Sequence, residues 1–279
     1  MVALITGNFD DSQSTGDVWT VAGYVGYSNQ WDHFERLWAE ALDHHGVPYF
    51  HMKEMNDPNG VFAKWLPPQD HEPARRAFFK DLVAAIRKSG LYMVSSTVWI
   101  KDVERFNLEK GLALEPYPLA AYSCMSLIAM NYDDLPVTAV FDRIEKVESK
   151  LAMARSYADS DRHAYPGLCD TIATSWLPKP LTSREVPALQ AADLIAWEVR
   201  KANFGMRDWQ ISERPIGDRS EQFKHYMAYT REKTGEDPIL RKSLDALLSD
   251  MPIKAIVWDY QQLTTTNEIR RGIWTPEAA

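Results

Sequence analysis

The alternation of apolar and polar positions along the chain predicts an α/β protein. An apolar run at residues 2–10 is typical of a strand, and a second run at residues 18–26 follows it after a polar turn at residues 11–17. Two such runs separated by a short polar segment favour a β-hairpin. Further strand-like runs, rich in β-branched and aromatic residues, occupy residues 91–100, 137–142 and 171–176.

Helical periodicity alternates with these later strands. Apolar residues recur every three to four positions after Ser28, which predicts a helix that ends near Gly46. Similar patterns predict further helices at residues 73–88, 117–132, 144–158 and 187–203. A hairpin followed by alternating helices and strands favours a mixed sheet with helices on both faces.

The same pattern predicts the domain organisation. Residues 1–203 are expected to form one α/β domain, with no linker long enough to divide it. Residues 204–279 are expected to form a mostly helical extension packed on the same domain. Its helix signals lie near residues 220–232 and 238–249, and the run at residues 253–258 is either a strand or a packed tail.

Composition narrows the class of protein. Of the 279 residues, 45% are hydrophobic and 25% charged, which is enough for a substantial core. The formal net charge of −8 argues against broad, non-specific binding to nucleic acid or membranes, although it leaves room for a local basic groove. No apolar run reaches the roughly 18–20 residues of a membrane span. Cys124 and Cys169 have no metal-type spacing, so we expect a reduced, cytoplasmic protein. The oligomeric state does not follow from the sequence.

Three aspartates stand in apolar surroundings far apart in the sequence. Asp10 closes the first apolar run, Asp142 closes the run at residues 137–141, and Asp193 lies inside the apolar helix at residues 187–203. Burying a carboxylate is costly unless it is paired or holds a cation. Two strand-end carboxylates and one from a late helix suit a hard divalent ion, Mg²⁺ or Mn²⁺. The alternative for each strand-end aspartate is a helix cap or a turn residue.

Short motifs around these aspartates carry a family resemblance. The segment Phe9-Asp10-Asp11-Ser12 resembles the aromatic-Asp-Glu-Ser-Gly opening of the domain of unknown function 3800 family, with Asp11 in place of Glu and Gln13 in place of Gly. The helical segment at residues 189–196 resembles the closing leucine-glutamine-x-alanine-aspartate motif of the same family. Phe50-His51 and Val140-Phe141-Asp142 resemble its intervening landmarks.

That family is similar to the ribonuclease-H-like nucleases, and the resemblance covers roughly residues 1–203. It implies a ribonuclease-H-like mixed sheet flanked by helices, with Asp10, Asp142 and Asp193 as catalytic metal ligands. Asp10 is then the central, bridging ligand, because it comes from the middle strand of such a sheet. Asp11 follows it directly and is expected on the opposite face if the strand continues.

A polar cluster at residues 51–54 supplies two further candidates. The resemblance implies an additional acid between the first and middle strands, and Glu54 is the metal ligand that best fits this role. His51 is a candidate catalytic residue, because a histidine can orient water or transfer a proton near neutral pH. Lys53 could meet a phosphate. The alternative is a solvated loop or helix start with local ion pairs.

Other polar residues are weaker candidates. Gln190 precedes Asp193 by three residues and so shares its helix face, where it could hold the backbone of a strand end or a water. Lys179 and Arg184 precede the same helix and could line a phosphate-binding rim. Glu145 suits a helix start better than a metal site. The remaining histidines show no ligand spacing, and the adjacent His44 and His45 are expected to point about 100° apart on a helix.

These observations leave three functional hypotheses. The first is a metal-dependent phosphoryl-transfer enzyme, a phosphodiesterase or nuclease acting on nucleic acid or a small phosphodiester. The second is a non-catalytic interaction module that retains the fold, of mobile-element or defence origin. The third is a small-molecule hydrolase such as a phosphatase, which needs a closed pocket rather than an open groove. Fold resemblance alone does not choose among them.

Overall fold

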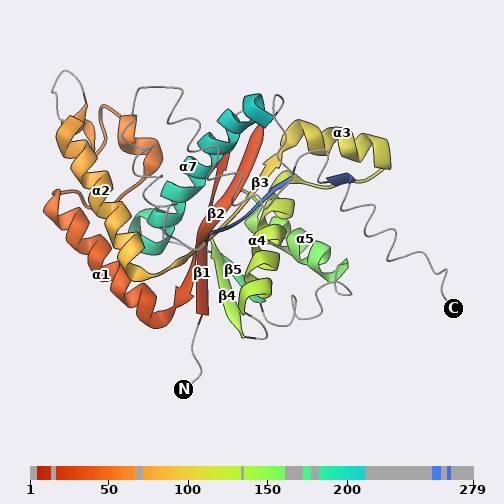
Figure 1. Ribbon diagram of the computed structural model, residues 1–279, viewed down its shortest axis with the longest axis horizontal. Helices are drawn as coiled ribbons and strands as arrows, with labels where there is room; N and C mark the ends of the chain where they lie inside the picture. Colours follow the sequence, from red (N-terminus) through yellow and green to blue (C-terminus); the bar gives the residue numbers. More distant parts are fainter. Residues whose placement is uncertain are drawn as a thin grey trace.

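A six-stranded mixed sheet organises the protein, with helices on both of its faces (Figure 1). The strand order is β5-β4-β1-β2-β3-β6. The strands are β1 (Ile5–Gln13), β2 (Val18–Tyr27), β3 (Tyr92–Trp99), β4 (Val137–Phe141), β5 (Ile172–Trp176) and β6 (Ile253–Trp258). The computed structural model describes residues 5–13, 17–66, 72–132, 135–160, 172–176, 182–210, 253–258 and 263–264.

Strand directions divide the sheet into three parts. β1, β2 and β3 form an antiparallel meander at its centre. β4 and β5 add to β1 in parallel, and β6 adds to β3 in parallel. The predicted α/β class, a mixed sheet flanked by helices, is confirmed by this arrangement.

The helices form two layers. The first face of the sheet carries α1 (Ser28–His44), α2 (Glu72–Ser89) and α7 (Pro187–Gln210), whose side chains share one hydrophobic core. The second face carries α3 (Ile100–Lys110), α4 (Pro116–Tyr132) and α5 (Val147–Ser160), which share another core. Three short 3₁₀ helices are η1 (Met52–Asn56), η2 (Ala63–Trp65) and η3 (Ser183–Glu185).

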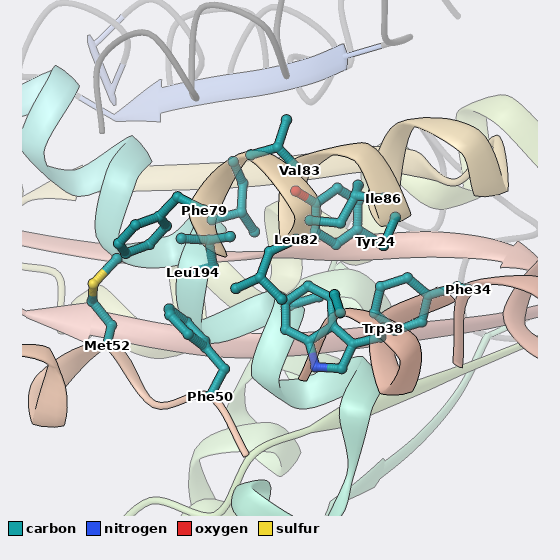
Figure 2. Packing of buried hydrophobic residues seen from close by; sticks show 14 of the residues in the cluster. Tyr24, Phe34, Trp38, Phe50, Met52, Phe79, Leu82, Val83, Ile86 and Leu194 are labelled. Atoms are coloured by element: carbon teal, nitrogen blue, oxygen red, sulfur yellow. The ribbon is translucent and has the colours of Figure 1, made fainter. Parts of the chain in front are cut away.

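The first core is unusually aromatic and holds the segment that leads into η1. Phe50 is fully buried, and its ring lies 6.0–6.3 Å from the rings of Trp38, Phe62, Phe78 and Phe79. Figure 2 shows Phe50 beside Trp38 and Leu82, with Met52 and Phe79 next to one another. Such ring pairs add about 0.5–1.5 kcal/mol each beyond the area they bury. Phe50 therefore anchors the backbone on either side of His51.

Several predicted boundaries differ from the observed ones. β1 does not end at Asp10 but continues to Gln13, because Asp11, Ser12 and Gln13 pair with Val21, Thr20 and Trp19 of β2. The prediction of a turn beginning at residue 11 was therefore wrong. Polar residues extend this strand because its neighbour supplies the backbone partners, whatever the side chains.

The predicted domain boundary at residue 203 lies inside α7, which runs on to Gln210. The run at residues 253–258 is a strand, β6, and belongs to the same sheet. The helix signals near residues 220–232 and 238–249 lie outside the described residues. Within the described part of the chain, no helix combines the length and the hydrophobicity that crossing a membrane requires.

Glycine permits a close contact at the centre of the sheet. Gly23 of β2 pairs with Phe9 of β1, and a Cβ atom at this position would lie 1.8 Å from the backbone oxygen of Asn8. Such an approach is impossible for any residue with a side chain. Gly23 therefore lets β1 and β2 pair at their observed spacing just before Asp10.

Candidate functional site

Asp10 and Asp142 occupy neighbouring positions on two parallel strands. Phe9 pairs with Phe141 in the β1–β4 register, and the backbone N–H of Asp142 continues the pairing by donating to the carbonyl of Phe9 at 2.8 Å. Phe9 and Phe141 both belong to the core of the second face. Because successive side chains of a strand alternate between faces, Asp10 and Asp142 both lie on the first face, beneath α7.

Asp193 comes to this face from above. α7 packs across β1 and β2, with Ala191, Ala192 and Leu194 buried around Asp193. The Oδ2 atom of Asp193 accepts a 2.6 Å hydrogen bond from the backbone N–H of Met52, at the start of η1. The helix therefore contributes a carboxylate and at the same time fixes the segment that carries His51.

Gln190 provides a second attachment one helical turn earlier. It is buried, and its Oε1 atom accepts hydrogen bonds of 2.9 Å from both the backbone N–H of Phe50 and the indole Nε1 of Trp38. Its Nε2 atom donates to the carbonyl of Arg184 at 2.7 Å. Gln190 therefore holds the backbone at residues 50 and 184, outside the strands, rather than the backbone of a strand end as expected. Gln190 and Asp193 therefore accept hydrogen bonds from the backbone N–H groups of Phe50 and Met52, on the two sides of His51.

The three aspartates share one electrostatic environment. Burial raises the pKa of Asp10 well above its ordinary value, and the charges of Asp193, Asp142 and Asp11 raise it further, in that order. Burial also raises the pKa of Asp142 and of Asp193, and the charge of Asp142 adds to the effect on Asp193. Like charges disfavour ionisation of one another. A positive charge among these carboxylates would therefore stabilise their ionised forms.

Each of the three carboxylates has one oxygen fixed by a backbone N–H. Asp11 donates to Oδ1 of Asp10 at 2.7 Å, Arg143 donates to Oδ1 of Asp142 at 2.7 Å, and Met52 donates to Asp193. These bonds orient the side chains. A separate group of three ligating side chains, His44, His45 and Asp81, has ligand atoms within 4.8 Å of one another.

His51 lies between Phe50 and Met52, whose backbone N–H groups donate hydrogen bonds to side chains of α7. It is the N-cap residue of η1 and has an extended backbone, with φ −150° and ψ 119°. Its imidazole opposes the rise in the pKa of both Asp142 and Asp193, so it lies close enough to act on both carboxylates. Its Nδ1 atom is buried and has no hydrogen-bond partner within the part of the chain that the structure describes.

Glu54 is engaged by two side chains at the edge of this group. Its Oε2 atom accepts a 2.7 Å hydrogen bond from the Tyr49 hydroxyl, and its Oε1 atom is ion-paired with the Arg184 guanidinium. That guanidinium also stacks over the Tyr49 ring at 5.1 Å. The ion pair joins residues 130 positions apart rather than neighbours in a solvated loop. Both carboxylate oxygens of Glu54 therefore already have partners within the protein.

Asp11 lies on the opposite face, as expected for a strand that continues past Asp10. Its Oδ2 atom accepts a 3.0 Å hydrogen bond from the indole of Trp19. The Lys150 ammonium lies over the Trp19 ring at 4.9 Å and over the Tyr117 ring at 5.5 Å. Burial raises the pKa of Asp11 to about 6. Asp11 therefore belongs to a separate polar contact among α4, α5 and β2.

Sequence reasoning passed over Ser183, whose side chain hydrogen-bonds to Asp142 and lowers its pKa against the effect of burial. The local signal was present, since Thr182 and Glu185 form a reciprocal capping box around η3. This box holds Ser183 and Arg184 at the start of α7. Of the two predicted rim residues, Arg184 lies beside Glu54, whereas Lys179 lies outside the described residues.

Comparison with known proteins gives a limited picture. No protein-family model matches the chain, and no curated protein matches it. Among solved structures, the chain is similar to the crystal structure of Bst-RNase HIII in complex with Mn²⁺. The match has a TM-score of 0.41 and 17% sequence identity, and covers 88% of this chain and 70% of that one. The resemblance to the domain of unknown function 3800 family stays a prediction.

Proposed function

We propose that the protein is a metal-dependent phosphoryl-transfer enzyme that cleaves phosphodiester bonds, with Asp10, Asp142 and Asp193 as its divalent-metal ligands. One observation carries this proposal. Three carboxylates, one on β1, one directly after β4 and one on α7, lie on the same face of the sheet, and the charges of Asp193 and Asp142 raise the pKa of Asp10.

The donor set fits a hard divalent cation. All three ligands are carboxylate oxygens, the type that Mg²⁺ and Mn²⁺ prefer. When bound, such ions activate water and stabilise charge on the phosphate. Asp10, on β1 at the centre of the sheet, would be the central member of this donor set, because the charges of Asp193 and Asp142 both raise its pKa.

His51 is the proposed proton-transfer residue. Its imidazole lowers the pKa of Asp142 and of Asp193 against the effect of burial, so the ring lies near both carboxylates. The hydrogen bonds from Phe50 and Met52 to α7 fix the backbone on either side of it. An imidazole held in this way can take a proton from the attacking water or give one to the leaving oxygen. Such transfer contributes about 10²–10⁴-fold to the rate.

Arg184 is the proposed contact for a substrate phosphate. Its side chain is half exposed, with 52% of its surface accessible, and it lies between the Tyr49 ring and Glu54. A guanidinium forms paired hydrogen bonds with phosphate oxygens. Binding of a phosphate here would loosen the hold of Arg184 on Glu54, and Glu54 would then have an oxygen available for a metal ion.

The substrate class is a nucleic acid or a small phosphodiester. A net charge of −8 disfavours tight binding that depends on many phosphate contacts. A short single-stranded segment, or a small molecule with one phosphodiester, needs fewer such contacts. Arg184 offers one of them beside the carboxylates.

A screen of substrates with matched variants tests this proposal. Single-stranded DNA, RNA, RNA–DNA hybrids and small phosphodiesters are incubated with Mn²⁺ or Mg²⁺ and the wild-type protein, Asp10→Asn, Asp142→Asn or Asp193→Asn. Asp32→Asn, at an exposed position on α1, is the control. We expect hydrolysis by the wild type and the control alone. Equal background rates in the wild type and Asp10→Asn on every substrate would instead support a non-catalytic interaction module.

A further inference from the structure

A second group of ligating side chains lies between the end of α1 and the middle of α2. His44 is the last residue of α1, His45 is its C-cap, and Asp81 belongs to α2. Each offers one ligand atom, and the three atoms lie within 4.8 Å of one another. Successive helical residues are about 100° apart, yet the two imidazole rings meet edge to face with centroids 4.8 Å apart. The expectation that these two histidines diverge was therefore wrong.

Surrounding contacts hold His45 in place. Its Nε2 atom lies 2.8 Å from Oδ2 of Asp81, and its side chain is only 9% exposed. The ring packs edge to face against Phe78 at 5.3 Å and Trp65 at 6.3 Å. The Lys64 ammonium donates to the backbone carbonyl of His45 at 2.8 Å. Binding a ligand normally requires the imidazole ring to lose conformational freedom. The contacts of His45 already restrict its ring in the folded protein.

The other two side chains are accessible. His44 is exposed, and the Asp81 side chain retains 45% of its accessible surface. Both line a hollow of about 230 Å³ between α1 and α2. A ligand can therefore approach from solvent and keep a water as an additional partner. Glu40 and Lys88 line the same hollow with opposite charges, and the C-terminal end of α1 favours a positive charge beside it.

We propose that His44, His45 and Asp81 form a binding site for a divalent transition metal of the zinc class. Two imidazoles and one carboxylate are a typical protein ligand set for zinc, with an open fourth position for water. Imidazole nitrogen discriminates against Mg²⁺, which favours oxygen ligands. Ligands of a tetrahedral zinc at about 2.0–2.2 Å lie roughly 3.4 Å apart. The His45–Asp81 pair at 2.8 Å must then open by about half an ångström, which the half-exposed Asp81 side chain allows.

The proposed site would connect α1 to α2. These helices, with α7, enclose the aromatic core that anchors Phe50. A metal ion bound at His44, His45 and Asp81 therefore stabilises this layer without taking part in chemistry at the three aspartates. This inference does not depend on the proposed function.

Zinc titration of the full chain tests the site. Isothermal calorimetry with Zn²⁺ is run in millimolar Mg²⁺, which occupies oxygen-rich sites and leaves imidazole sites to Zn²⁺. The proteins are the wild type, His44→Ala and Asp81→Asn, with His33→Ala as the control because His33 is exposed on the same helix. Even partners of metal ligands are worth about 10–100-fold in affinity, so loss of a ligand should weaken binding by at least roughly tenfold. His33→Ala should bind as the wild type does.

Two further readouts separate metal binding from the hydrogen bond between His45 and Asp81. Co²⁺ in the wild type should give visible absorption bands that Zn²⁺ abolishes and that His44→Ala lacks. Zn²⁺ affinity should also fall when the solution is acidified, because protons compete with the metal ion for its ligands. The proposal is overturned if His44→Ala and Asp81→Asn bind Zn²⁺ as tightly as the wild type, or if the wild type shows no binding.

Discussion

The Oδ2 atom of Asp193 accepts a 2.6 Å hydrogen bond from the backbone N–H of Met52, which lies 141 residues earlier in the chain. The side chain of Asp193 therefore serves the fold as well as any metal ion. Replacing it with alanine removes both the negative charge and the acceptor of this bond. Replacing it with asparagine removes the charge and keeps an acceptor oxygen, so the two variants separate the two roles.

We predict that Asp193→Asn retains or raises the melting temperature of the metal-free protein, whereas Asp193→Ala lowers it. The reason is that the charge of Asp193 raises the pKa of Asp10, and removing it relieves repulsion. Saturating Mn²⁺ should stabilise the wild type by about 5 °C and leave Asp193→Asn unchanged. Thermal denaturation followed by fluorescence, with a chelator or with Mn²⁺, measures both effects. A wild-type shift in Asp193→Asn would remove this aspartate from the metal site.

Gln190→Ala should destabilise the protein by roughly 2–4 kcal/mol, because it leaves the buried donors of Trp38 and Phe50 without an acceptor. It should also lower kcat more than it changes KM, since the backbone beside His51 loses its support. Chemical denaturation and steady-state kinetics provide the two readouts. Gln30→Ala is the matched control, because Gln30 also bonds two backbone groups but on the surface. Equal losses in both variants would contradict the special role of Gln190.

Arg184→Gln should raise KM by roughly 10- to 100-fold with a smaller effect on kcat, the range expected when a charged hydrogen bond to phosphate is lost. Glu54→Gln distinguishes two roles for that residue. If Glu54 is a metal ligand, its variant needs more Mn²⁺ for half-maximal activity; if it only holds Arg184, the Mn²⁺ dependence stays unchanged and KM moves.

The exposed pair Arg36–Glu40 on α1 supplies a control for this experiment. Both of its side chains are 59% accessible, and exposed pairs contribute at most about 1 kcal/mol to stability. Arg36→Gln should therefore leave both KM and the Mn²⁺ dependence unchanged. An equal rise of KM in Arg36→Gln and Arg184→Gln would point to a general charge effect rather than a phosphate contact.

Asp11 should make the protein less stable as pH rises from about 4 to 6. Burial raises the pKa of Asp11 from 3.8 to about 6 in the folded state. The folded chain then binds more protons than the unfolded chain within this window, so stability falls as pH increases. The shift corresponds to at most about 3 kcal/mol. Urea denaturation at several pH values should show a shallower decline in Asp11→Asn, with Asp32→Asn behaving as the wild type. Parallel curves for Asp11→Asn and the wild type would contradict this.

The layers of the fold could be predicted from the sequence, but the position at which each strand ends could not. Alternation and helical periodicity arise from burial against one neighbouring layer, which a single chain segment records. The extension of β1 through Asp11, Ser12 and Gln13 depends on backbone pairing with β2, and the polar side chains of these three residues do not indicate a strand. No helix was predicted at α3, although Val103 and Phe106 lie three residues apart and Gly111 ends the helix in the left-handed conformation.

The candidate site was less accessible from the sequence. Asp10, Asp142 and Asp193 could be singled out because acids are conspicuous in apolar segments. The contacts of Glu54 with Arg184 and of Gln190 with Phe50 could not, since they join positions 130 and 140 residues apart. The meeting of His44 with His45 was missed for another reason. Helical geometry fixes the direction of the Cβ atoms, whereas the ring positions depend on side-chain rotamers and on Asp81 across the helix pair.

The most direct test of the proposed metal centre is calorimetric titration of the purified protein with Mn²⁺, comparing the wild type, Asp10→Asn and the control Asp32→Asn. Asp10 is the acid whose pKa is raised by both other aspartates, so it is the ligand whose loss should matter most. We predict saturable Mn²⁺ binding by the wild type and Asp32→Asn, and none by Asp10→Asn. Identical binding curves for the wild type and Asp10→Asn, or no binding by either, would contradict a metal centre at these three aspartates.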